Sequence, residues 1–122
     1  MVDKVTRGTR KRFEIYITDL GGSAQNPFSC HVQLIKEGEY SYDSPKGPYV
    51  CTNKRGVDGY QAADVYLSTS MTLGNWIAHF TWMAIEGGPV DADFFRFIIQ
   101  DKVRPWINRR AGAIPPNVEV VG

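Results

Sequence analysis

Residues 62–85, AADVYLSTSMTLGNWIAHFTWMAI, are the stretch that decides the expected fold, because they predict two strands around one tight turn. Gly74-Asn75 is a two-residue hairpin signal that places Leu73 opposite Trp76. Strand side chains alternate between the two faces of a sheet, so this register separates an apolar face from a polar one. The apolar face holds Val65, Leu67, Thr69, Met71, Leu73, Trp76, Ala78, Phe80, Trp82 and Ala84. We expect this face to be covered and the other to be free for binding.

Residues 90–107 supply the predicted cover. Asp91 and Asp93 are typical of a helix N-terminus, where carboxylates cap unpaired N–H groups and suit the helix dipole. Apolar residues then recur with roughly helical spacing. They are Phe94, Phe95, Phe97, Ile98, Ile99, Val103, Trp106 and Ile107. Pro105 predicts a kink, and Gly112 predicts the end of the helix. The expected fold class is therefore α+β, with helix on one face of an antiparallel sheet.

The first half of the chain predicts further strands. Residues 12–19 and 28–37 alternate between apolar and polar, and residues 49–55 form another strand-like run. We expect about six strands, an N-terminal hairpin plus a main sheet, followed by one C-terminal helix or two short ones. All of this fits one domain spanning residues 1–122.

A second copy of the chain is expected to complete the core, because one kinked helix cannot cover the predicted sheet. The helices would then lie on the partner's sheet in an intertwined homodimer, as obligate dimers share a core. The expected dimer interface is the apolar side of the helix, formed by Phe95, Ile98, Ile99 and Trp106.

Charge is balanced overall but uneven along the chain. The formal net charge is +1, whereas residues 1–12 and residues 95–110 each carry a net charge of +4. Such clusters are about as often an ordinary soluble surface as a contact for phosphate groups or for assembly.

Several function classes lack support in the sequence. The N-terminus shows no secretory signal, and no apolar run approaches the ~20 residues that span a membrane. Cys30 and Cys51 are predicted to be buried thiols, with a disulfide between neighbouring strands left open. His31 and His79 lack the partner spacing of metal ligands or catalytic groups, and a strand histidine is usually an ordinary surface residue. We therefore expect no enzyme, no metal, no cofactor, no small-molecule substrate and no membrane partner.

The segment NWIAHFTWMAIEGGPVDADFFRFIIQDKVRPWI at residues 75–107 carries a family resemblance. It resembles the last strand, connecting loop and first C-terminal helix of the coat proteins of single-stranded RNA bacteriophages, the leviviruses. The run YVCTNKR at residues 49–55 is similar to that family's central strand, and DLGG at residues 19–22 to its N-terminal hairpin turn. The short turn at Gly74-Asn75 and the extended PPNVEVVG at residues 115–122 depart from the family pattern.

The resemblance implies a viral capsid protein. Its homodimers would assemble in the host cytoplasm into an icosahedral shell, the virion, and its inner sheet face would bind and package single-stranded RNA. Position within the strand implies that Thr52 and Lys54 face the RNA and that Cys51 faces the helices. A turn-based register would instead place Asn53 and Arg55 on the RNA side. The residues that match the RNA side only by their face are Tyr66, Ser68, Ser70, His79 and Thr81.

Two other classes remain open from the sequence. One is a non-capsid protein that binds single-stranded nucleic acid through a polar, aromatic sheet face. The other is a phage structural accessory module without RNA binding, whose polar face meets only solvent.

Overall fold

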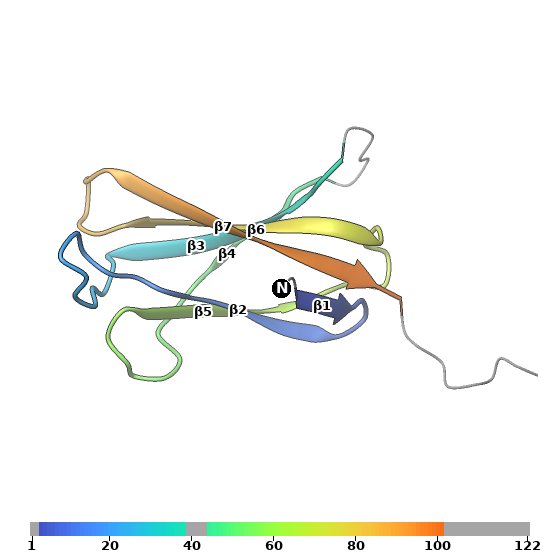
Figure 1. Cartoon of the computed structure of the whole chain (residues 1–122), viewed down its shortest axis with the longest axis horizontal. Coiled ribbons are helices and arrows are strands. Elements are labelled where there is room, and N and C mark those ends of the chain that lie inside the picture. Colours follow the sequence, from blue (N-terminus) through green and yellow to red (C-terminus); the bar gives the residue numbers. More distant parts are fainter. Residues whose placement is uncertain (1–2, 39–43, 102–122) are drawn as a thin grey trace, which may run out of the picture.

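The computed structural model describes residues 3–38 and 44–101, and every regular element in these residues is a β-strand (Figure 1). The strands are β1 (Asp3–Thr6), β2 (Arg10–Tyr16), β3 (Ser29–Lys36), β4 (Lys46–Val50), β5 (Tyr60–Tyr66), β6 (Gly74–Met83) and β7 (Val90–Gln100). The part of the chain that the structure describes contains no helix that could cross a membrane.

The strands form two sheets that lie face to face as the layers of a β-sandwich (Figure 1). One sheet has five strands in the order β1-β7-β6-β3-β4, and the other pairs β2 with β5. All neighbouring strands are antiparallel except β1 and β7, which run parallel. In the larger sheet, the order β7-β6-β3-β4 corresponds to strands G, F, C and C′ of immunoglobulin-like sandwiches. In the facing sheet, β2 and β5 correspond to strands B and E.

The core between the sheets follows from strict alternation along the strands. On β2, for example, Phe13 and Ile15 are buried while Arg12 and Glu14 are exposed. Phe13 meets Phe97 of the other sheet edge to face, with ring centroids 5.1 Å apart. The largest fully buried side chains are Trp76, Tyr60, Phe80, Ile17, Leu34, Leu67, Ile99 and Val32. Aromatic and branched aliphatic residues from both sheets therefore hold the layers together.

The expected helix over residues 90–100, and with it the α+β class, is wrong: this segment is β7, paired along its length with β6. Its side chains alternate between the core side (Phe95, Phe97, Ile99) and the outer face (Phe94, Arg96, Ile98). A run that is apolar on both faces fits a helical period and a strand period equally well. Aromatic and β-branched residues favour the strand. The rest of the predicted helix, including Trp106, lies outside the described residues.

The hairpin predicted for residues 62–85 is also wrong, although most of its apolar face is buried as predicted. β5 pairs with β2, whereas β6 pairs with β3 and β7, so the two strands lie in opposite sheets. The indole of Trp76 donates to the carbonyl of Thr72 at 2.8 Å, which anchors the crossing segment between the sheets. The buried members of the apolar face are Val65, Leu67, Met71, Trp76, Ala78 and Phe80. Alternation reports which side chains face the core, but not which strand is the neighbour.

The strands predicted over residues 12–19 and 28–37 are confirmed in most of their length as β2 and β3, whereas the strand predicted over residues 49–55 is wrong beyond Val50. The N-terminal hairpin is also wrong, because β2 and β3 lie in different sheets. β4 ends at Val50, and Thr52 forms an isolated bridge with Ala62 of β5, so the chain changes sheets there. Cys30 and Cys51 are free and buried, as predicted, and the Cys51 N–H donates to the Cys30 carbonyl at 2.9 Å. The contact with the Cys30 thiol, together with burial, raises the pKa of Cys51. Both thiols are core groups.

Candidate functional site

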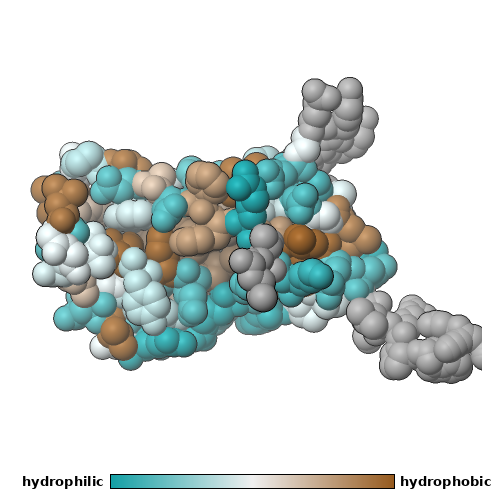
Figure 2. Space-filling model, in the orientation of Figure 1, coloured by the Kyte–Doolittle hydropathy of each residue, from teal (hydrophilic) through white to brown (hydrophobic). Residues whose placement is uncertain are grey.

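One side of the sandwich is hollowed between β2 and β7. The hollow has a volume of about 500 Å³ and is walled mainly by phenylalanines from both layers. The apolar lining consists of Phe13, Ala78, Phe80, Phe94, Phe95 and Phe97, and the charged rim of Asp3, Lys11, Arg12, Glu14 and Arg96. Figure 2 shows apolar residues gathered in the middle of this side, over β7, among hydrophilic ones. We call this hollow the β2–β7 groove.

The β2 side of the groove is a strand edge without a strand partner among the described residues. The Leu67 N–H bonds to the Thr9 carbonyl and the Ile17 N–H bonds to the Gly59 carbonyl, so odd-numbered residues of β2 face β5. The N–H and C=O groups of the even-numbered residues therefore point to the open side. Such an edge is a template for pairing with another strand.

The β7 side of the groove is bare along the first half of that strand. β1 pairs only with residues 97–100 of β7, and the Arg7 N–H donates to the Gln100 carbonyl at 3.0 Å. Even-numbered residues of β7 therefore direct their backbone groups to this edge. Residues 90–96 have no strand on it within the described part of the chain, and the Phe94 N–H bonds to the Asp93 carboxylate at 2.8 Å instead.

Phe95 is the least covered of the core-side residues that line the groove. It points toward the core side of β7 but keeps 48% of its surface exposed. Its ring meets that of Phe80 at 5.9 Å between centroids, and the narrower β2–β5 sheet leaves the rest uncovered. The groove is therefore a place where the sandwich core is incomplete.

The charges around the groove are already paired with one another. The ion pairs are Lys11–Asp3 at 3.4 Å, Arg12–Asp64 at 2.8 Å and Arg96–Glu37 at 3.2 Å. The hydrogen bond from Arg12 holds the pKa of Asp64 below its usual range. Exposed pairs of this kind contribute about 0–1 kcal/mol each. An apolar hollow with a neutralised rim suits an apolar peptide segment better than a charged small molecule.

A second surface lies on the outer face of the β2–β5 sheet, where tyrosines and cations gather. The Arg55 guanidinium lies 4.9 Å from the Tyr60 ring centroid and donates to the Tyr16 hydroxyl at 3.0 Å. Tyr60 is buried beneath it, and its hydroxyl donates to Glu14 at 2.5 Å, which raises the pKa of Tyr60. This tyrosine–arginine face consists of Arg10, Arg12, Tyr16, Arg55, Tyr60 and Tyr66. Two of its tyrosines, Tyr16 and Tyr66, are more than half exposed.

The structure divides the predicted RNA-binding residues between the two sheets. Tyr66 ends β5, and the hydroxyls of Ser68 and Ser70 follow it, 2.8 Å apart. Thr52 bridges to β5, and Lys54 lies close enough to lower the pKa of Asp64. Thr52 therefore lies beside the middle of β5, whereas Tyr66, Ser68 and Ser70 lie at its end and beyond it.

His79 and Thr81 lie elsewhere, on the outer face of the five-stranded sheet. On β6 they face Phe94 and Ala92 of β7. The outer faces of the two layers point in opposite directions, so the seven residues do not form one surface.

The predicted dimer residues are also separated. Ile99 is 1% exposed and lies in the core of its own sandwich. Ile98 lies half-buried on the outer face, Phe95 lies in the groove, and Trp106 is outside the described residues.

Sequence reasoning missed both the groove and the tyrosine–arginine face. The alternating run RKRFEIY at residues 10–16 was a signal for the face, because it puts Arg10, Arg12 and Tyr16 on one side of a strand. The groove had no such signal, since it depends on which strands lack neighbours.

The described residues hold no cluster of three or more His, Cys, Asp or Glu side chains that could bind a metal ion. No protein-family model, curated protein or solved structure matches the chain.

Proposed function

We propose that the protein is a structural recognition module that binds an extended peptide segment in the β2–β7 groove. The observation that carries this proposal is the pair of bare strand edges on either side of a phenylalanine-lined hollow. An added strand gains affinity from main-chain hydrogen bonds and specificity from pockets for alternate side chains. Of the classes that the sequence leaves open, a structural accessory module fits this geometry best.

The energetics favour a guest with apolar side chains. Covering Phe95 removes apolar surface from water, and pairing with the β2 edge satisfies backbone groups that otherwise bond to solvent. The Asp93 carboxylate accepts a hydrogen bond from the Phe94 N–H and so occupies a backbone donor on the β7 edge. A strand that pairs with this edge would displace the carboxylate. The β2 edge carries the pairing, and the phenylalanines supply the pocket.

Panning a library of short random peptides against the folded protein tests this function. We expect enrichment of sequences that alternate apolar and polar residues, since only every second side chain of a strand enters the hollow. A Phe95→Asp variant should lose these peptides, whereas Val90→Asp, on the outer face of the same strand and outside the groove lining, should keep them. If the Phe95→Asp variant enriches the same peptides as the parent, or if the parent enriches none, the groove is refuted as a binding site.

Bound peptides can be located by hydrogen exchange at single amides. The N–H groups of Arg12 and Glu14 point to the open edge of β2, so a bound strand should slow their exchange. The N–H of Phe13 already faces β5 and serves as the internal control.

A second candidate function is the binding of single-stranded RNA on the tyrosine–arginine face. Exposed Tyr16 and Tyr66 offer stacking platforms, and the neighbouring cations Arg10 and Lys54 offer phosphate contacts. Fluorescence anisotropy with labelled single-stranded RNA tests it: Lys54→Ala should weaken binding to many sequences alike and lower the salt slope by about one.

The coat-protein role that the resemblance implies stays a prediction. Electron microscopy of protein expressed in bacteria tests it, because a coat protein would form closed shells containing nuclease-resistant RNA. Particles without RNA would point to the structural module alone.

A further inference from the structure

We propose that residues 117–121 of a second copy of this chain occupy the β2–β7 groove, so that two copies exchange their C-terminal segments. This inference rests on the proposed function and names the guest. Exchange of one segment in each direction closes a symmetric dimer, in which both grooves are filled.

The sequence of the segment suits the groove. Residues 117–121 read NVEVV, so Val118 and Val120 share one face of an extended strand while Glu119 and Val121 share the other. β-Branched residues favour strands, and Pro115-Pro116 limit the pairing to the residues that follow them.

Charge also fits this guest. Glu119 is the only charged side chain in residues 111–122. The three cations of the groove rim are already held in ion pairs, so an apolar segment suits the hollow. With the two valines directed into the hollow, Glu119 lies on the opposite face of the strand, where its charge stays in solvent.

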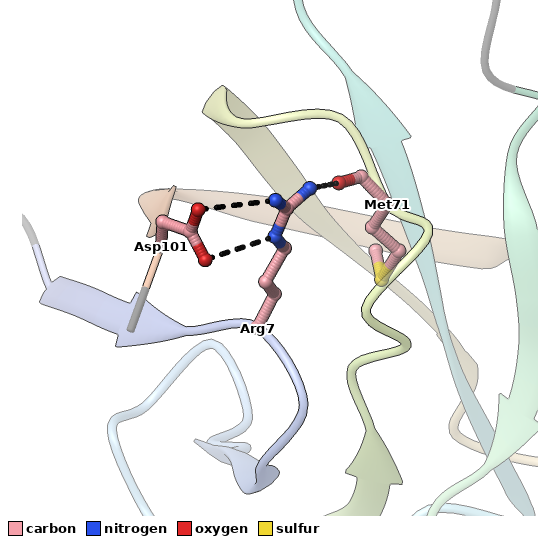
Figure 3. Close-up of polar contacts among 3 residues, drawn as sticks. All are labelled: Arg7, Met71 and Asp101. Carbon is pink, nitrogen blue, oxygen red and sulfur yellow. Dashed lines mark hydrogen bonds and ion pairs between the residues drawn. The ribbon is translucent and has the colours of Figure 1, made fainter. Parts of the chain in front are cut away.

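The exit of the chain from β7 favours a second copy over the same copy. Arg7 donates to both carboxylate oxygens of Asp101, at 3.4 and 3.2 Å, and to the Met71 carbonyl at 3.2 Å (Figure 3). This clamp fixes the chain just beyond β7, while β1 fills the edge beside residues 97–100. A segment returning to its own groove must reverse there and pass β1, whereas a segment that continues forward leaves its own sandwich.

The connecting length is sufficient for exchange. Residues 102–116 are fifteen residues, which span up to about 50 Å when extended. The eleven-residue strand β7 is shorter, at about 36 Å. The connection is therefore long enough to reach past the sandwich.

Complementation between two defective full-length chains tests the exchange. The first chain, Phe95→Asp, has a blocked groove and an intact segment. The second, Val118→Asp with Val120→Asp, has an intact groove and a defective segment. The matched control is Val121→Asp, which changes the other face of the strand. Sedimentation equilibrium measures association, and circular dichroism checks folding.

We expect the parent and Val121→Asp to form dimers, and each defective chain alone to associate at least about tenfold more weakly. An equal mixture of the two defective chains should form a mixed dimer, because one intact segment meets one intact groove. Should Phe95→Asp fail to fold, Phe95→Ala replaces it.

Other outcomes separate the two proposals. If the double valine variant associates like the parent while Phe95→Asp does not, the guest is wrong but the groove stands. If the mixture forms no mixed dimer, exchange between copies is refuted. If neither defective chain differs from the parent and no peptide binds, the proposed function fails as well.

Discussion

Replacing Phe95 by alanine isolates the contribution of the groove to binding. A phenylalanine side chain buries roughly 200 Å² when fully covered, and Phe95 keeps 48% of its surface exposed, so about 100 Å² remains for a guest to cover. At about 25 cal/mol per Å² this area corresponds to about 2.5 kcal/mol, as an upper value. Alanine retains part of it, so we expect a loss of about 2 kcal/mol, or roughly 30-fold in affinity.

Val90 provides the matched control for this change. It lies on the outer face of β7 and is 58% exposed, and it is not among the residues that line the groove. Val90→Ala should therefore weaken binding by less than about threefold. Fluorescence anisotropy with a peptide recovered by panning gives both affinities, and chemical denaturation confirms that both variants fold. Equal losses in the two variants would show that the guest does not enter the groove.

Three further predictions follow from the two layers and their contacts. Tyr66→Ala should cost about 1–3 kcal/mol of affinity for single-stranded RNA, measured by fluorescence anisotropy. His79→Ala, on the opposite layer, should leave this affinity unchanged. Equal losses in the two variants would contradict binding on the tyrosine–arginine face. Ile99→Asp should abolish the folded sandwich in circular dichroism, not merely dimer formation, because it buries an unpaired charge at a position 1% exposed. Tyr60→Phe should lower the free energy of unfolding by about 1 kcal/mol at neutral pH, since Glu14 loses a donor. The pKa of Tyr60 is raised, so the neutral phenol contributes its stabilisation fully below pH ~10. This contribution is lost as the pH rises through the raised pKa. The denaturation curves of parent and variant should therefore converge at high pH.

The alternation of apolar and polar residues in the sequence predicted many of the side chains that face the core of the sandwich. The alternation around Val65 and Trp76 correctly marked core positions on β5 and β6. The turn signal at Gly74-Asn75 did not make these strands partners, because the chain uses residues 67–73 to cross between sheets. Local spacing carries no information about that crossing, which is set by long-range pairing with β2 and β3.

The helix predicted over residues 94–99 failed for a different reason. FFRFII is apolar on both faces, since Phe95, Phe97 and Ile99 serve the core while Phe94 and Ile98 lie on the outer face. Such a run satisfies a helical period and a strand period at once. The family resemblance favoured the helix, and pairing with β6 along the whole strand decided otherwise.

The candidate sites were less accessible to sequence reasoning than the core. Tyr66 and Lys54 belong near the tyrosine–arginine face, but their grouping with His79 required a single sheet that the protein does not form. The β2–β7 groove follows from β1 being four residues long against eleven in β7, a mismatch visible only once the two are paired.

The parallel pairing of β1 with β7 has a mechanical consequence. When tension is applied through the residues before β1 and after β7, the two strands are pulled in opposite directions along their common axis. The backbone bonds between them, together with the Arg7–Asp101 ion pair, then share the load in shear instead of opening one after another like a zipper. A module joined to its neighbours at both ends would therefore resist stretching at its first and last strands, and rupture of this short ladder would precede extension of the remaining sheet.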